Sequence, residues 1–383
     1  MKVAVLGNQS RAMVNFWSVL IRSLVRAGHE VVCLAPAGDS DWEGRLRDLG
    51  ARLVRYPLDR KGLNPLRDLR TLLALRRIFL REKPDALFAY TIKPVIYGTL
   101  AAALAGHPAA RNRHVMITGL GYMFEADSPI KRILRHVAVL LYRLAFSLAG
   151  TAFFQNAADR ELFERLKIVP KGMRLAMTPG TGVDLERFSL AALPPLPLVF
   201  LLIGRLLAAK GLYEYYEAAK LLRQRYPDAR FQLLGPPETG LGGVPLEEAR
   251  SWHTEGVIEY LGEASDVRPY LAAAHVLVLP SYREGAPTAV MEAMASGRAA
   301  VVTDVPGCCE TVTHNENGRI VRARDAASLA AGMEWYLANP SLAAVHGANA
   351  RKRAEAEFDA DNVASRIMAA MGVTISCFSA TGR

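Results

Sequence analysis

The chain has 383 residues, a length that suggests two domains of ordinary size. Its hydrophobic content of 51% is ample for two cores and excludes a largely disordered chain. The formal net charge is +10, with basic residues concentrated in the first half, but no nucleic-acid-binding motif accompanies this charge, so nucleic acid is not an expected partner.

The N-terminal half alternates apolar strand patterns with helical ones, which predicts a parallel, doubly wound sheet. The expected strands are Val3–Leu6, Glu30–Ala35, Arg52–Pro57, Ala86–Tyr90, His114–Thr118 and Ala152–Gln155. The first turn, with Gly7 and Asn8, has no G-x-G-x-x-G pattern, so a dinucleotide is not expected in this half. Gly119 and Gly121 follow the fifth strand and permit close backbone approach. Either a tight strand-to-helix loop or a ligand contact accounts for these two glycines.

Two segments of this half combine arginines with many apolar residues. The first runs over 67–81 and the second over 129–148, where Lys131, Arg132, Arg135, His136 and Arg143 interrupt the longest apolar stretch and exclude a membrane span. Basic amphipathic helices of this kind fit an anionic membrane surface. Two ordinary surface helices with arginine-rich solvent faces would show the same pattern.

A proline-rich break at Leu193–Pro197 places the domain linker at 189–197, between a first domain over 1–188 and a second over 198–357. The second domain repeats the strand–helix alternation. Its expected strands are Leu198–Ile203, Phe231–Leu234, Ile258–Leu261, Val276–Leu279 and Ala299–Val302. A helical pattern follows over 358–373, and the last residues, 374–383, lack periodicity and are expected to be loose.

The segment Ser281–Glu310 reads as a loop, a helix over Thr288–Ser296 closed by Gly297, and a strand. The loop begins at the carboxyl end of a parallel strand, where open α/β sheets bind ligands. Two carboxylates, Glu284 and Glu292, stand eight residues apart in it.

Pro287, near the first helical position, leaves the amides of Ala286, Thr288 and Ala289 without helical acceptors, which favours an anion site at the positive end of the helix dipole. The pattern suits a ligand that carries both hydroxyls and phosphate. A capped helix with a solvated acid in its first turn fits the spacing equally well.

Two cations, Arg205 and Lys210, follow the first strand of the second domain around the turn at Gly204. They lie at the carboxyl end of that strand and can approach one ligand together. Ordinary surface charge is the alternative explanation.

The stretch 283–312, REGAPTAVMEAMASGRAAVVTDVPGCCETV, resembles the E-x7-E signature of the family 4 glycosyltransferases. The similarity covers almost the whole chain and includes GRLLAAKG at 204–211, LPSYREG at 279–285 and PGTGVDLERF at 179–188. In the N-terminal half, LNPLRDL at 63–69, YTIKPVIYG at 90–98 and ITGLGYMF at 117–124 resemble a narrower branch. Enzymes of that branch add N-acetylhexosamines or related sugars to undecaprenyl-diphosphate-linked glycans.

The resemblance implies a GT-B fold, in which two Rossmann-like domains with doubly wound parallel sheets face a central cleft. It also implies transfer with retention of anomeric configuration. In the family, the turn with Gly7 and Asn8 lies at the cleft, near donor phosphate or acceptor, and the C-terminal helix packs back on the first domain. Gly119 and Gly121 are further candidates for a cleft contact.

Carried over by position, the resemblance implies that Glu284 contacts hydroxyls of the transferred sugar and helps to orient it. It likewise implies that Glu292 binds the ribose hydroxyls of the nucleotide. Arg205 and Lys210 would neutralise the donor diphosphate. The remaining donor contacts would come from the backbone of Gly204, Gly285, Ala286, Pro287 and Thr288. The family has no evident enzymatic base, and we name none. Related sequences often have Arg where Thr288 stands, which leaves phosphate affinity more dependent on the two cations.

We expect no cofactor and no metal site, since the UDP-sugar is a substrate. Asp39-Ser40-Asp41 imitates the D-x-D metal motif of another glycosyltransferase fold, but it follows the second strand and reads as a solvated turn or a helix cap. The chain passes from Met1 directly into a strand, without a signal peptide, and its four cysteines form no C-x-x-C pair. These features predict a cytoplasmic protein, peripheral on the inner face of the cytoplasmic membrane.

The partners expected are therefore a UDP-sugar, a polyprenyl-diphosphate-linked saccharide and an anionic membrane surface. Two other functions remain open. A non-hydrolysing UDP-N-acetylglucosamine 2-epimerase has a similar fold, but would need no lipid acceptor and would give the basic helices no purpose. A non-catalytic, membrane-surface sugar-binding protein would not need Glu284, Glu292, Arg205 and Lys210 together. The sugar, the linkage and the oligomeric state do not follow from the sequence.

Overall fold

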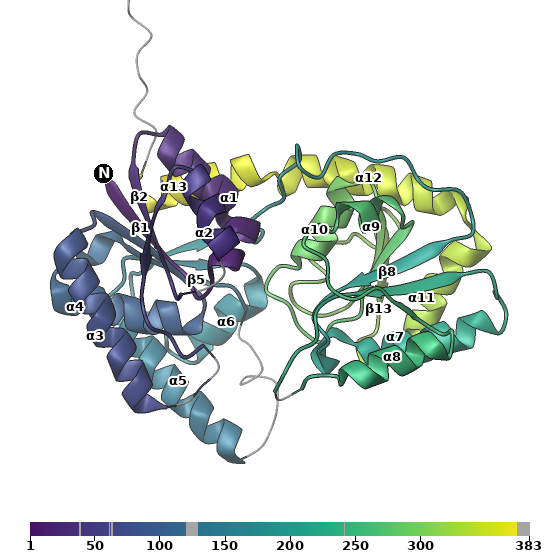
Figure 1. The fold of residues 1–383 in the computed structure, drawn as a ribbon, viewed down its shortest axis with the longest axis horizontal. Coiled ribbons are helices and arrows are strands. Elements are labelled where there is room, and N and C mark those ends of the chain that lie inside the picture. The colour runs from purple at the N-terminus through teal and green to yellow at the C-terminus, as the bar shows by residue number, and fades with distance from the viewer. Residues whose placement is uncertain (38–39, 61, 63, 120–128, 241, 374–383) are drawn as a thin grey trace, which may run out of the picture. The chain divides into compact units, whose positions relative to one another are not determined.

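A computed structural model describes residues 1–37, 40–60, 62, 64–119, 129–240 and 242–373 of the chain. The contacts divide the protein into two compact units (Figure 1). Unit 1 comprises Met1–Thr181 together with the chain from Ala360 onward, and unit 2 comprises Gly182–Asp359. Each unit is built on one parallel sheet, so the predicted α/β class with two doubly wound domains is confirmed.

Unit 1 has a seven-stranded sheet in the order β3-β2-β1-β4-β5-β6-β7, with every pairing parallel. Its strands are β1 (Lys2–Leu6), β2 (Glu30–Ala35), β3 (Arg52–Arg55), β4 (Ala86–Tyr90), β5 (Arg113–Ile117), β6 (Thr151–Phe154) and β7 (Arg174–Met177). The sequence predicted the first six within a few residues. It did not predict β7, a short strand with no fully buried residue, because only strands buried on both faces give a continuous apolar run.

Helices cover both faces of this sheet (Figure 1). They are α1 (Ser10–Arg26), α2 (Ser40–Asp48), α3 (Pro65–Glu82), α4 (Thr99–Ala105), α5 (Pro129–Ser147), α6 (Ala157–Arg165) and α13 (Ala360–Met371), with a π-helical turn η1 (Pro94–Gly98) and a 3-10 turn η2 (Ala110–Asn112). One apolar core joins the sheet to α1, α2 and α13, and the other joins it to α3–α6. The last helix thus packs on α1, at the opposite end of the sequence.

Unit 2 has a six-stranded parallel sheet in the order β10-β9-β8-β11-β12-β13. Its strands are β8 (Val199–Ile203), β9 (Arg230–Leu234), β10 (Glu259–Tyr260), β11 (Val276–Leu279), β12 (Ala299–Thr303) and β13 (Gly318–Val321). Its helices are η4 (Ala208–Lys210), α7 (Leu212–Arg223), α8 (Leu246–Thr254), α9 (Arg268–Ala272), α10 (Thr288–Ala295), α11 (Ala326–Ala338) and α12 (Ser341–Glu357). The sequence analysis did not predict β13, an edge strand whose two middle residues are only half-buried.

The proline-rich segment predicted as the linker, 189–197, belongs to unit 2, because the chain passes between the units at Thr181 and Gly182. Polar side chains hold the segment to the sheet. The buried Arg298 donates from Nη2 to the Ala192 carbonyl at 2.8 Å. His275 accepts from the Val199 amide at Nδ1 (3.1 Å), so its Nε2 is the nitrogen that donates to the Pro194 carbonyl at 3.0 Å. Proline stiffness marks this segment in the sequence, but hydrogen bonds that no sequence pattern reveals fix it to unit 2.

Candidate active site

The loops after two neighbouring strands of unit 2, β8 and β11, lie against each other. The first loop ends in η4, and the second begins at Pro280. Gly211 has φ +72°, and a methyl group there would lie 2.1 Å from the Pro280 carbonyl oxygen, so only glycine permits this approach. The Tyr282 amide also donates to the Ala209 carbonyl at 2.9 Å, which joins the second loop to η4.

Lys210 and Glu284 meet where these two loops touch. The Lys210 Nζ forms an ion pair with Glu284 Oε1, and the Ser281 hydroxyl donates to the same oxygen at 2.7 Å. The two charged side chains are only 22% and 14% exposed, so water screens their charges less than it would on an open surface. The structure therefore brings together two of the three residues predicted to be catalytic.

A third loop, which follows β12, supports the backbone of Glu284. The Glu284 amide donates to the Pro306 carbonyl at 3.1 Å. Gly307 has φ +85°, and a methyl group on it would lie 2.4 Å from the Glu284 carbonyl oxygen. Glu310 holds Gly307 in turn, since its Oε2 accepts from the Gly307 amide at 2.7 Å. Sequence reasoning assigned no role to Ser281, Gly307 or Glu310, although all three lie within the stretch that it singled out.

Arg205, the other predicted cation, has a different partner. Its Nη1 lies 2.5 Å from Glu238 Oε2, and Arg205 is half-exposed, whereas Glu238 is only 11% exposed. Glu238 lies in the loop after β9, and Gly235 begins that loop. Gly235 packs closely against Gly204, because a methyl group on Gly235 would lie 1.7 Å from the Gly204 carbonyl oxygen. No sequence pattern pointed to Glu238, because its loop follows β9 and shares no motif with β8.

Helix α10 begins at Thr288, as predicted, with Pro287 at its N-cap, and Gly297 (φ +76°) ends it. Among the residues that the structure describes, none accepts a hydrogen bond from the amides of Ala286, Thr288 or Ala289. Free amides at a helix N-terminus form a site for an anion.

Glu292 lies on the same helix but has other neighbours. Burial raises the pKa of Glu292 to about 7, with Arg187 lowering it and Asp266 raising it further. The carboxyl group therefore titrates near neutral pH rather than staying ionised. Arg187 lies in the PGTGVDLERF motif, but neither it nor Asp266 could be assigned to Glu292 from the sequence.

Three predicted candidates of unit 1, Gly7, Asn8 and Gly119, lie at the carboxyl edge of its sheet. Gly7 follows β1, and its carbonyl accepts from the Tyr56 hydroxyl at 2.7 Å. A methyl group on Gly7 would lie 2.1 Å from the Tyr90 hydroxyl oxygen, so a larger residue would require the Tyr90 side chain to move, and Asn8 follows directly. Gly119 has φ +112°. Gly121 and Asp39 are outside the described residues.

The two halves of the chain match two sequence families. Residues 12–179 match "Glycosyl transferase 4-like domain", and residues 197–339 match "Glycosyl transferases group 1". Together the two matches span most of the protein.

Two curated relatives are similar along most of their length. The N,N'-diacetylbacillosaminyl-diphospho-undecaprenol alpha-1,3-N-acetylgalactosaminyltransferase of Campylobacter jejuni is 28% identical, over 96% of this chain and 97% of the relative. The UDP-Gal:alpha-D-GlcNAc-diphosphoundecaprenol alpha-1,3-galactosyltransferase of Escherichia coli is 27% identical, over 73% of each chain.

Solved structures match the fold. The sucrose-phosphate synthase of Thermosynechococcus elongatus superposes with a TM-score of 0.78 and 19% identity, over 96% of this chain and 97% of that chain. The Anabaena protein HepE in complex with UDP-glucose gives a TM-score of 0.76 at 18% identity, over 97% of this chain and 99% of that chain. The paired domain matches and this fold show that the chain belongs to the family 4, GT-B-fold glycosyltransferases.

Proposed function

We propose that the protein transfers a sugar from a UDP-sugar to a polyprenyl-diphosphate-linked saccharide, with retention of anomeric configuration. The observation that carries this proposal is the Lys210–Glu284 pair at the carboxyl ends of β8 and β11. Beside it in sequence are the free amides at the start of α10 and the titrating Glu292. The names of the Campylobacter and Escherichia relatives support the lipid-linked acceptor, and an N-acetylhexosamine is the sugar we infer.

The chemistry of the transfer requires positive charge at the donor diphosphate. Breaking the anomeric C–O bond leaves negative charge on the β-phosphate, and groups placed in advance stabilise charge that develops only in the transition state. Lys210 and the α10 amides are such groups, and Arg205 adds a second cation. Glu284 orients the sugar hydroxyls, and the departing phosphate takes the proton of the acceptor hydroxyl.

Glu292→Gln is expected to weaken UDP binding tenfold or more, because a hydrogen bond to a charged group contributes about 1.5–3 kcal/mol. Ribose hydroxyls that donate to Glu292 favour its ionised form. Since the pKa of Glu292 in the free protein is about 7, UDP binding should release a proton below that pH. UDP affinity should then rise with pH from 6 to 8, as calorimetric titrations can measure.

The phosphate groups of UDP also titrate in this range, and Glu292→Gln supplies the control because it removes only the contribution of the carboxyl group. The pH dependence should be steeper in the wild type than in the variant. Equal affinities and equal pH profiles would contradict the ribose contact.

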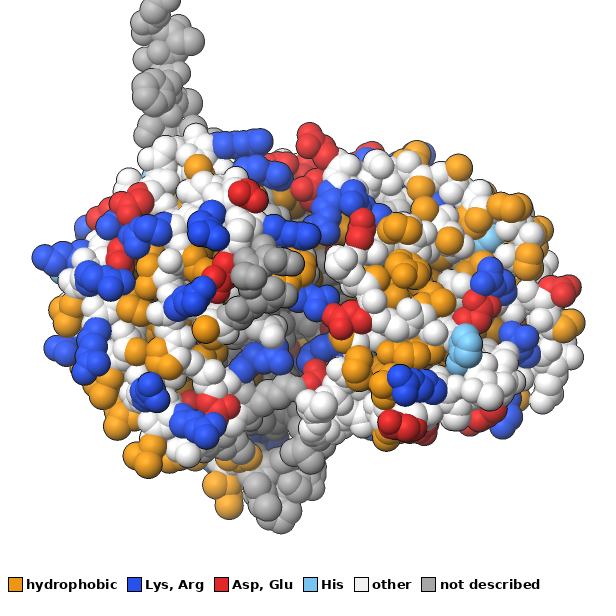
Figure 2. All heavy atoms as spheres, viewed as in Figure 1, with side chains coloured by type: hydrophobic (Ala, Val, Ile, Leu, Met, Phe, Trp, Pro, Cys, Tyr) orange, Lys and Arg blue, Asp and Glu red, His pale blue; other side chains and the backbone are white. Residues whose placement is uncertain are grey.

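Unit 1 carries the face that we assign to the membrane. Exposed apolar residues recur at helical spacing on α3 and α5: Leu66, Leu69, Leu73 and Leu80, then Ile133, Val137, Leu140 and Leu144. Figure 2 shows Lys and Arg side chains mixed with hydrophobic ones over the part of unit 1 that carries α3 and α4. A pocket of about 420 Å³ is lined by residues of α5 such as Arg135 and Arg143, together with Leu162 and Leu166.

None of the described helices is long and apolar enough to cross a membrane. An amphipathic helix with arginines beside its apolar face instead lies in the plane of the interface. We therefore infer peripheral association with the cytoplasmic membrane, where a polyprenyl-linked acceptor is held.

Binding to liposomes should require anionic lipid and fall as salt rises, because each basic residue near an anionic leaflet contributes about 1 kcal/mol. Arg132→Gln and Arg135→Gln should weaken this binding, whereas Arg268→Gln, an exposed arginine of unit 2, serves as the matched control. Vesicle flotation measures both effects. Equal binding to neutral vesicles at high salt would remove the electrostatic part of the argument.

The proposed reaction is tested directly by mixing the protein with a panel of UDP-sugars and a bacterial lipid extract, then following UDP release. Release that depends on the lipid extract supports transfer. An epimerase would convert UDP-N-acetylglucosamine without lipid, and a sugar-binding protein would bind UDP-sugar without turnover.

A further inference from the structure

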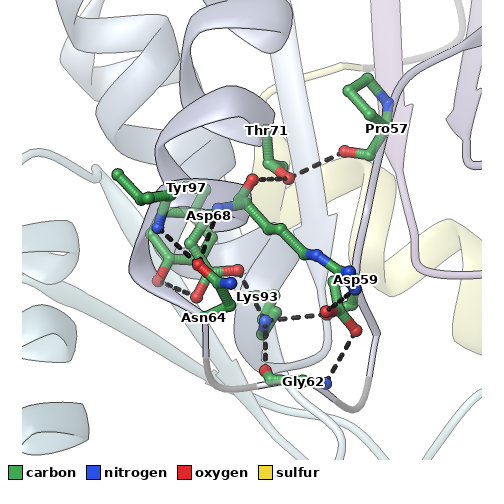
Figure 3. Close-up of polar contacts among 10 residues, drawn as sticks. Pro57, Asp59, Gly62, Asn64, Asp68, Thr71, Lys93 and Tyr97 are labelled. Atoms are coloured by element: carbon green, nitrogen blue, oxygen red, sulfur yellow. Dashed lines mark hydrogen bonds and ion pairs between the residues drawn. The ribbon is translucent and has the colours of Figure 1, made fainter.

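Two sequence motifs of the N-terminal half, LNPLRDL at 63–69 and YTIKPVIYG at 90–98, meet in one polar cluster of unit 1 (Figure 3). Lys93, which follows β4, donates from Nζ to Asp68 Oδ1 at 2.6 Å. The Tyr97 hydroxyl donates to the other oxygen of Asp68 at 2.9 Å. The side chains of Lys93 and Asp68 are 16% and 12% exposed, so the ion pair is largely buried.

The other two hydrogen bonds of Lys93 fix the backbone of the loop after β3. Its Nζ donates to the carbonyl oxygens of Asp59 and Gly62, both at 2.8 Å (Figure 3). An ammonium group has three donors, and these contacts with Asp68 and the loop use all of them. Lys93 therefore shapes its surroundings rather than offering a charge to a ligand.

The Asp59 carboxylate also stabilises the same loop. It accepts from the Gly62 amide at 2.8 Å and from Arg67 Nη1 at 3.0 Å, and Arg67 holds the pKa of Asp59 below its usual range. A methyl group on Gly62 would lie 2.1 Å from Asp59 Oδ2, so a side chain there would displace the Asp59 carboxylate from this position. Asp59 stays ionised and 23% exposed, which leaves it able to accept hydrogen bonds from a ligand.

The turn after β4, which leads to Lys93, holds a strained residue. Thr91 has φ +67°, which is rare for a β-branched residue and costs conformational energy. Its buried hydroxyl oxygen has no hydrogen-bond partner among the described residues. Strain and an unpaired polar group in one residue, two positions before Lys93, indicate a functional constraint on this turn.

The position of the cluster in the sheet also favours a functional role. β3 and β4 both belong to the parallel sheet of unit 1, and ligands of such sheets bind at the carboxyl ends of the strands. A largely buried ion pair is also a poor source of stability, because apolar side chains of similar volume often stabilise a fold as well or better. We therefore explain the Lys93–Asp68 ion pair by a requirement for one particular conformation of the loop after β3.

We propose that Asp59 and Gly62 form part of the site for the saccharide of the acceptor, and that Lys93 is the positioning residue that holds them in place. This inference rests on the proposed function. The Asp59 carboxylate would accept hydrogen bonds from sugar hydroxyls.

Lys93→Met tests the proposal in transfer assays with the lipid-linked acceptor. The acceptor KM should rise by about tenfold or more, since positional errors in a binding loop weaken ligand contacts. The Kd for UDP should stay unchanged, because the UDP site lies in unit 2. Arg52→Gln is the matched control, because Arg52 lies at the other end of β3 and pairs with the largely buried side chain of Glu82, and it should leave the acceptor KM unchanged.

Loss of an ion-pair partner can unfold a protein, so a second variant separates stability from positioning. Lys93→Met with Asp68→Leu and Tyr97→Phe replaces the three polar side chains by apolar ones, and its thermal unfolding should approach that of the wild type. Its acceptor KM should nevertheless remain raised. A folded triple variant with the wild-type acceptor KM, or an equal loss of UDP affinity in Lys93→Met, would overturn the positioning role alone. Failure of the wild type to transfer any sugar to lipid would overturn the proposed function, and this inference with it.

Discussion

Replacing Lys210 by alanine is expected to lower kcat by about a hundredfold or more, because the loss of one donor to the transition-state charge has effects of this size. Lys210 is the last residue of η4, and it forms an ion pair with Glu284 in the loop after β11. Donor diphosphate and Glu284 would share this cation. Steady-state kinetics with saturating acceptor measure the loss, and KM for the donor should change less than kcat.

Lys220→Ala is the matched control, since Lys220 is an exposed lysine of α7 that lies over the ring of Tyr216. Lys220→Ala should leave kcat unchanged. Arg205→Ala, like Lys210→Ala, should lower kcat, and Glu238→Gln would show whether the ion-pair partner of Arg205 affects turnover. A Lys210→Ala variant that keeps wild-type kcat would remove this residue from the mechanism.

Excess EDTA is expected to leave wild-type activity nearly unchanged, because the proposed mechanism assigns the positive charge at the phosphates to Lys210, Arg205 and the α10 amides. Activity that collapses in EDTA and returns with Mn²⁺ would mean that a metal ion carries this role. The contributions of the two cations would then have to be reassigned.

Glu284→Gln should lose far more turnover than donor affinity. The substitution keeps the shape of the side chain but removes the charge that we propose orients the sugar hydroxyls, and orientation matters most at the transition state. It also removes the partner of Lys210 and leaves Ser281 facing an amide. Glu292→Gln is the internal control, because it should mainly weaken UDP binding. Near wild-type kcat with only a raised KM in Glu284→Gln would contradict the orienting role.

Much of the fold follows from local patterns in the sequence. The unit β11–α10–β12 has the predicted boundaries within one residue, because a fully buried strand gives a continuous apolar run and Pro287 and Gly297 mark the helix ends. Strands β7 and β13 were not predicted, because half-buried or exposed residues occupy the middle of each strand and neither gives a continuous apolar run. The E-x7-E segment, with both glutamates in one local stretch, was likewise visible in the sequence.

Only the tertiary structure decided which side chains are partners. Lys210 pairs with Glu284, Arg205 with Glu238, and Lys93 with Asp68, and each pair joins different loops or elements that the sheet order brings together. Sequence spacing cannot report such pairs, because contacts across a parallel sheet depend on strand order rather than on distance along the chain. The pKa of Glu292 is of the same kind: the residue was identified from the sequence, but its titration near neutral pH follows from burial beside Asp266 and Arg187. The sequence identifies the ionisable residues of the site, but the electrostatic environment of each group arises only when distant segments pack around it.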